Sequence, residues 1–134
     1  MRDAYANVTV RASLAIATRA ASANGSSVDR YGGGAMFQDA AVVVHTGTIT
    51  DGSHAVDVQE SDDNSTWTSV AASELQGSEP SIVAADDDKT FVIGYKGSKR
   101  YLRVAVTASG ATTGGVYGAL VVLASPRNAP VVHA

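Results

Sequence analysis

The side chains that could carry out chemistry are few and scattered. The three histidines, His45, His54 and His133, belong to no HExxH or HxH motif. Because zinc ligands usually come in such closely spaced sets, a metal site here would have to be assembled by folding alone. Cysteine and the GxSxG motif are also absent, which removes two common kinds of enzyme nucleophile. We therefore predict no catalytic residues, no metal site and no cofactor.

The acidic residues form two clusters, Asp62-Asp63 and Asp86-Asp87-Asp88. Oxygen-rich loops can hold Ca²⁺, but neither cluster has the D-x-[DN]-x-[DN]-G spacing of a calcium loop with its bidentate glutamate. Glycoside hydrolysis would need two carboxyl groups that face each other across a cleft, which turn residues do not favour. We interpret both clusters as turn residues that keep a protein of low charge soluble.

Two further features have both a binding and a structural interpretation. Gly32-Gly33-Gly34 lacks the lysine and the following Ser or Thr of a phosphate-binding loop, so a flexible loop is expected there. Trp67, the sole tryptophan, would stack on a sugar ring if exposed on a glycan-binding module. In a β-sandwich a tryptophan is more often part of the core, which is the interpretation that we favour.

Composition narrows the class of protein. The chain has 134 residues, enough for one domain with its own core. Its net charge of −3 does not suit a nucleic-acid binder, which normally carries a basic surface. No apolar run approaches the ~20 residues that span a bilayer, and polar residues interrupt the N-terminal segment where a signal peptide would be apolar. We expect neither nucleic acid nor membrane as a partner.

The elements that would position these side chains are strands. Apolar residues alternate with polar ones at the start of the chain, which predicts a half-buried strand with Val8, Val10, Ala12, Leu14 and Ile16 on one face. Further strands are predicted over 35–37, 41–46, 55–61, 66–70, 91–95, 101–107 and 116–124. The last of these is apolar on both faces, so it should be a central strand or one covered by a partner subunit.

Turn residues separate the predicted strands. Thr50-Asp51-Gly52-Ser53 and Asp62-Asp63-Asn64-Ser65 each stand between two strands and predict two hairpins. About eight short strands punctuated in this way indicate an all-β, single-domain β-sandwich. Pattern alone leaves a jelly-roll-like and an immunoglobulin-like sandwich open. Residues 1–34 are expected to form an N-terminal arm or strand with a Gly-rich loop, 35–126 the sandwich core, and 127–134 an extended C-terminal tail.

Several stretches resemble small β-sandwich structural proteins of tailed bacteriophages. They are the hairpin V-D-V-Q-E-S-D-D-N-S-T-W-T at 56–68, R-Y-L-R-V at 100–104, G-V-Y-G-A-L-V-V-L at 115–123 and S-P-R-N-A-P at 125–130. The group suggested is the head decoration, or cement, proteins. The resemblance implies a non-enzymatic protein of the virion, made in the host cytoplasm, that binds the outside of the capsid lattice. Its partners would be the major capsid protein and itself, as a homotrimer.

Such a protein needs exposed strand edges and termini that become ordered on binding. The candidates for contacts with the capsid or between subunits are Val8, Val10, Arg11, Leu14, Ile16, Arg30, Tyr31, Val131 and Val132. An ordinary edge strand and a frayed end explain the two terminal segments equally well. The alternative function is a phage tail or receptor-binding module that binds a host surface glycan, with Trp67 in its groove.

Overall fold

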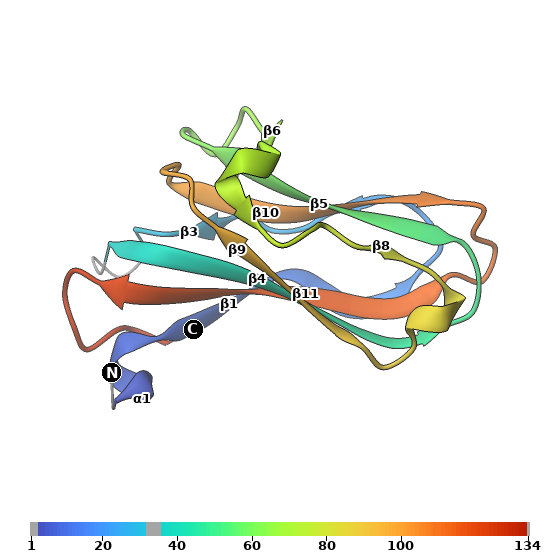
Figure 1. Cartoon of the computed structure of the whole chain (residues 1–134), viewed down its shortest axis with the longest axis horizontal. Coiled ribbons are helices and arrows are strands. Elements are labelled where there is room, and N and C mark those ends of the chain that lie inside the picture. Colours follow the sequence, from blue (N-terminus) through green and yellow to red (C-terminus); the bar gives the residue numbers. More distant parts are fainter. Residues whose placement is uncertain (1–2, 32–35, 134) are drawn as a thin grey trace.

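The computed structural model describes residues 3–31 and 36–133, and the prediction for Gly32-Gly33-Gly34 lies outside this part of the chain. Two sheets pack face to face as a β-sandwich (Figure 1), which confirms the predicted fold class. The first sheet has the strand order β1-β11-β4-β9-β7, and the second has β2-β10-β5-β6, with β3 on β10 and β8 on β5. Every pairing is antiparallel.

The first sheet is built from long strands. Its members are β1 (Thr9–Arg19), β4 (Phe37–Ile49), β7 (Leu75–Gln76), β9 (Thr90–Tyr95) and β11 (Gly115–Pro126). The second comprises β2 (Ala23–Asn24), β3 (Val28–Asp29), β5 (Ser53–Ser61), β6 (Thr68–Ser69), β8 (Ser81–Ile82) and β10 (Tyr101–Ser109). In the described part of the chain, the helical elements are α1 (Ala4–Asn7), η2 (Ala72–Glu74) and η3 (Ala84–Asp86). Among the described residues, no helix is long and apolar enough to cross a membrane.

The core lies between the sheets, where β-branched and aromatic side chains of alternating positions meet. β11 runs between β1 and β4 and is therefore a central strand, as its apolar sequence predicted. The fully buried side chains of the core include Val42, Val44, Val58, Ile82, Ile93, Leu102, Val104, Tyr117, Val121 and Leu123.

The first strand corrects the prediction for one apolar face. Leu14 is buried, but Val10 is 43% exposed and Ile16 72% exposed, so the even-numbered residues do not share one environment. The pairing of β1 with β11 shifts register between Ala12 and Leu14 and again between Leu14 and Ala17. A β-bulge adds a residue to one strand and redirects the side chains that follow it, which strict alternation cannot anticipate.

The turn at Asp51-Gly52 also differs from expectation. It joins β4 of the first sheet to β5 of the second, so the predicted hairpin is wrong. The Asp51 carboxylate accepts hydrogen bonds from the backbone N–H groups of Thr112, Thr113 and Gly114, which fastens the turn to the β10–β11 connection. The second predicted hairpin is confirmed, since β6 pairs with β5 across the Asp62-Asp63 turn.

Both ends of the described chain lie at the same end of the sandwich, beside α1 (Figure 1). The ring of His133 stands 4.3 Å from that of Tyr5, and its Nε2 lies 2.7 Å from the Tyr5 carbonyl oxygen. Val131 is buried and donates its backbone N–H to the Ala6 carbonyl. The C-terminal tail is thus packed against the N-terminal helix.

Candidate functional site

The outer face of the first sheet carries exposed apolar side chains. The register places Ala12, Leu120, Val43 and Val92 in one row across β1, β11, β4 and β9. A parallel row holds Val10, Val122, Ala41 and Gly94. Neither row contains a charged residue. We call this surface the apolar face and define it by Val10, Ala12, Ile16, Val43, Val92 and Leu120.

A groove of about 570 Å³ indents the apolar face across β11, with β1 on one side and β4 and β9 on the other. Gly118 contributes to it by lacking a side chain, because a Cβ there would stand 2.7 Å from a side-chain carbon of Ile16 and 2.9 Å from the Leu14 carbonyl oxygen. At the border of the groove, His45 Nδ1 lies 3.0 Å from the hydroxyl of Thr90. The groove therefore offers an apolar surface with two hydrogen-bonding side chains at one edge.

Large apolar side chains are unusually exposed on this face. Val92 is 62% exposed and Leu120 42%, in addition to Val10 and Ile16. Single exposed apolar residues are common on proteins, but several that adjoin on neighbouring strands mark an interaction surface. We therefore take the apolar face as the candidate functional site.

The structure places the predicted contact residues in four environments: the apolar face, the core, the packed terminal segments and a second cavity. Val10 and Ile16 belong to the apolar face, whereas Leu14 is part of the core. Arg11 donates to the Val132 carbonyl and thus helps to hold the tail. The three remaining predicted residues belong to the terminal segments. Val8 is the C-cap of α1, Val131 is buried, and Val132 is 59% exposed.

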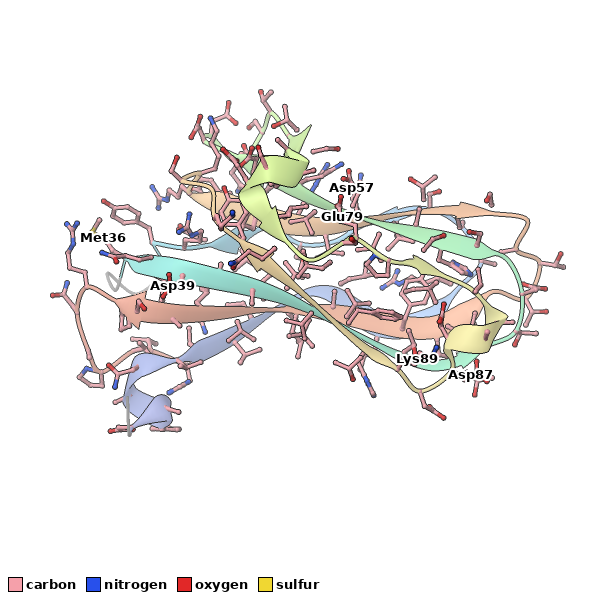
Figure 2. All side chains as sticks on the ribbon, in the orientation of Figure 1. Met36, Asp39, Asp57, Glu79, Asp87 and Lys89 are labelled. Atoms are coloured by element: carbon pink, nitrogen blue, oxygen red, sulfur yellow. The ribbon has the colours of Figure 1, made fainter. Side chains whose placement is uncertain are left out.

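Arg30 and Tyr31 lie elsewhere, at the end of the sandwich where Met36 is labelled (Figure 2). Arg30 is buried, and Tyr31 is about half exposed. Both line a second cavity, of about 330 Å³, together with Lys99, Arg100 and Arg127. Of the nine predicted contact residues, Val10 and Ile16 therefore belong to the apolar face, Arg30 and Tyr31 to this cavity, and the other five to neither.

Trp67 is not part of the core, so the favoured interpretation is wrong. Its ring is partly exposed, and the Arg103 guanidinium lies 4.5 Å from the ring centroid. Arg103 is an outward-facing residue of β10 and also donates to the Gln59 side chain. The tight Asp62–Ser65 turn and the short β6 strand bring Trp67 onto the outer face of the second sheet, where the arginine covers it.

The acidic clusters act as turn residues. The Asp63 carboxylate accepts hydrogen bonds from the backbone N–H groups of Ser65 and Thr66 and from the Ser61 hydroxyl, which lowers its pKa to about 2. The Asp87 carboxylate accepts from the Ile49 N–H. Within the described residues no three His, Asp or Glu side chains are grouped as metal ligands would be.

One carboxyl pair is perturbed. Glu79 accepts a hydrogen bond from the Val58 N–H beside the Asp57 carboxylate (Figure 2). Burial and the neighbouring Asp57 charge raise the pKa of Glu79, although its hydrogen bond from Val58 acts in the opposite direction. Asp57 in turn accepts from Gln59 and Ser69. The pair joins the 75–82 segment to β5.

Sequence reasoning missed Val43, Val92 and Leu120 as surface residues. The signal was present in the central strands, since 116–124 is apolar at both even and odd positions and Val92 stands between Phe91 and Ile93. A central strand with two apolar faces fits a sheet that is covered on both sides. Here the described chain covers only one side of the first sheet.

Comparison with known proteins identifies a shared fold and no family. No protein-family model matches the chain, and no curated protein matches it in sequence. Among solved structures, the PBSX exported protein XepA matches with a TM-score of 0.56 and 15% sequence identity. The match covers 87% of this chain and 37% of the XepA chain. The chain thus spans little more than a third of XepA, and at this identity the likeness concerns the fold alone.

Proposed function

We propose that the chain is a non-enzymatic structural protein of a tailed bacteriophage that binds the outside of the capsid lattice and stabilises the head. Its partners would be the major capsid protein and, on the lattice, two further copies of itself. It would be made in the host cytoplasm and carried on the exterior of the virion. The observation that carries this proposal is the apolar face, an exposed and uncharged sheet surface suited to a protein partner.

Two further observations support a phage origin. The hairpin at 56–68 and the strands that follow it resemble phage decoration proteins. XepA, which shares the fold, is a phage protein. Neither observation identifies the partner, so the assignment to the head depends on the experiment below.

The size of the apolar face suggests how binding would work. Completing the burial of a partly exposed Val, Leu or Ile side chain gains about 1–2 kcal/mol, since full burial gains about 1.5–3. Burial of the four large exposed side chains of the apolar face, those of Val10, Ile16, Val92 and Leu120, would therefore gain roughly 4–8 kcal/mol. This gain is similar to the lower estimates for the free-energy cost of association. A single copy would bind weakly through this face alone. If copies on adjacent lattice sites also contact one another, each copy would be held more tightly, although its own contacts with the capsid stay the same.

The test is a pelleting assay with purified, expanded capsids that lack the protein. We expect saturable binding at a fixed ratio to the major capsid subunit, and a shell that resists heat better once occupied. Val92→Lys and Leu120→Lys should each reduce binding at least tenfold, because each would bury an unpaired charge against the partner. Val83→Lys is the matched control, since Val83 is 40% exposed but lies outside the apolar face. Absence of binding by the unaltered protein would overturn the proposal.

A second candidate function has one observation in its favour. Trp67 is partly exposed on the outer face of the second sheet, and Tyr101 and Arg103 lie on the same face of β10. An exposed tryptophan can stack on a sugar ring, so a host surface glycan is the alternative ligand. Here the Arg103 guanidinium already occupies one face of the ring. Binding to host cells that Trp67→Ala abolishes, together with no binding to capsids, would favour this function.

A further inference from the structure

The cavity at the Met36 end of the sandwich is rich in cationic side chains. Its described lining includes Arg30, Lys99, Arg100 and Arg127 and contains no Asp or Glu. Tyr31, Met36 and Phe37 supply an apolar part of the wall. We refer to it as the basic pocket. It is separate from the apolar face, with which it shares no lining residue.

Arg30 is the feature of the basic pocket that needs explanation. Its side chain is only 8% exposed, and its guanidinium donates to the carbonyl oxygens of Gly97, Lys99 and Gln38 at 3.3, 2.8 and 2.8 Å. These bonds position the group but do not neutralise it. Its Nε is buried and has no hydrogen-bond partner in the described structure. Buried charges in proteins are normally paired, so a counter-charge is expected nearby.

The protein supplies that counter-charge only indirectly. The guanidinium of Arg30 lies 5.2 Å from the centroid of the Tyr95 ring, whose hydroxyl donates to the buried Glu60 carboxylate at 2.7 Å. Glu60 is therefore bonded to the far end of the Tyr95 side chain and forms no ion pair with Arg30 among the described contacts. Among the described contacts, no carboxylate is therefore bonded directly to Arg30.

The other cations are partly neutralised. Arg100 donates two hydrogen bonds of 2.9 Å to Asp29 and stacks between the rings of Tyr31 and Tyr101, each 5.0 Å away. Lys99 pairs with Asp62 at 2.6 Å. Arg127 is exposed and belongs to none of the ion pairs of the described chain. Two of the four charges, those of Arg30 and Arg127, are thus left without a carboxylate partner.

We propose that the basic pocket receives a carboxylate of a protein partner, with an apolar neighbour of that carboxylate against Tyr31 and Met36. Guanidinium groups bind carboxylates through paired N–H donors, and the apolar wall favours a peptide over a strongly hydrated inorganic anion. The carboxylate would belong to an Asp or Glu side chain or to a chain terminus. This site goes beyond the proposed function, because it would operate with any protein partner.

The test uses blocked peptides and the intact chain, without capsids, so that its outcome is independent of the pelleting assay. The probes are acetyl-Gly-Phe-Asp-Gly-amide, its Asn counterpart, acetyl-Gly-Gly-Phe with a free carboxylate, and inorganic phosphate. Binding is followed by NMR through the backbone amides of Gly97, Ser98 and Lys99. We expect one or both carboxylate peptides to shift these amides saturably, and the Asn peptide and phosphate to have at least tenfold weaker effects. The more effective of the two carboxylate peptides identifies the source.

Substitutions in the chain show whether the carboxylate peptide binds specifically in the basic pocket or is attracted equally to any positively charged side chain. Arg127→Gln should weaken the carboxylate peptide roughly tenfold or more, as expected when a charge-assisted hydrogen bond is removed. Lys89→Gln is the matched control and should change nothing, since Lys89 lies at the opposite end of the molecule (Figure 2). Arg30→Gln tests whether the buried charge contributes to binding of the carboxylate peptide. If the Arg30→Gln protein does not fold, Arg127→Gln still tests the proposal. Equal binding of the Asp and Asn peptides, or phosphate binding as tightly as the peptides, would overturn the proposal.

Discussion

At the scale of single residues, polar side chains inside the sandwich connect the two sheets. His54 of β5 is fully buried, and its Nε2 lies 3.1 Å from the Asp51 carbonyl oxygen, which can only accept. Nε2 therefore donates to this oxygen, and Nδ1 forms a hydrogen bond of 3.0 Å with the hydroxyl of Tyr117 from β11. Glu60 of β5 and Tyr95 of β9 form a second such connection.

The first prediction concerns the buried hydrogen bond between Tyr117 and His54. Tyr117→Phe keeps the ring but leaves His54 Nδ1 without its hydrogen-bond partner in the core. We expect the free energy of unfolding to fall by about 1–3 kcal/mol, the usual cost of an unsatisfied buried polar group. Chemical denaturation measures it. Tyr5→Phe, at a position that is 78% exposed, is the control; an equal loss in both variants would contradict the prediction.

The second prediction concerns pH and the Glu79–Asp57 pair. Because the pKa of Glu79 is raised in the folded state, that state binds more protons than the unfolded chain, so this group weakens stability as pH rises above about 4.5. Glu79→Gln removes the titration and keeps an acceptor for the Val58 N–H. We expect the variant to be more stable than the wild type at pH 7, by less than about 1 kcal/mol for a partly exposed group.

The measurement for Glu79 is a pair of urea denaturation curves for each protein, at pH 7 and at pH 3.5. At the lower pH the wild-type carboxyl is protonated, so the two proteins should have nearly the same midpoint. A variant that is less stable than the wild type at pH 7 would show that the hydrogen bond to Val58 outweighs burial and repulsion.

At the scale of elements, β1 connects the two sheets through its bulge. Ser13, the extra residue at the register shift, is buried, accepts the Val104 N–H and donates to the Ser26 carbonyl. The Gly25 N–H donates to the Val104 carbonyl in the same place. The edge of the first sheet is thereby fastened to β10 of the second.

The third prediction follows from the close approach at Gly25. A Cβ there would stand 2.6 Å from the Val104 carbonyl oxygen and 2.7 Å from that of Ser13, and backbone atoms cannot move aside cheaply. Gly25→Ala should therefore lower the free energy of unfolding by about 1–3 kcal/mol. In Gly47→Ala, the control, the nearest neighbours of the new Cβ would be atoms of Val116 at 3.4 Å or more, which is ordinary contact. Thermal unfolding compares the two, and similar melting temperatures would refute the prediction.

The same elements show what the sequence could predict. Strand positions and the central place of β11 follow from β-branched runs and apolar faces, which are local properties. The inward face of β1 could not be predicted, because it depends on a bulge opposite Leu120 and Ala119. The crossing at Asp51 depends on carbonyl and amide groups more than 60 residues away. Val10 and Ile16 of the apolar face were among the predicted contact residues, whereas Val43, Val92 and Leu120 were missed because an exposed and a covered strand have the same apolar pattern.

At the scale of the whole molecule, the two candidate surfaces lie on different parts of the sandwich. The apolar face occupies the outside of the first sheet, and the basic pocket lies at the end marked by Met36 (Figure 2). Asp87 and the rest of the acidic turn lie at the opposite end. A partner that engages both surfaces would fix the orientation of the sandwich, since the apolar face alone is uncharged and gives little directional preference.

The contact between Tyr5 and His133 has a consequence for how the chain could be rewired. Because the two described ends touch, a short linker could join them, and new ends could be opened elsewhere as a circular permutant. The turn at Ser109-Gly110 suits the opening, since it is exposed and a Cβ on Gly110 would meet no other atom within 4 Å. Cutting there would move a genetically encoded cargo to the far side of the molecule while every strand kept its neighbours.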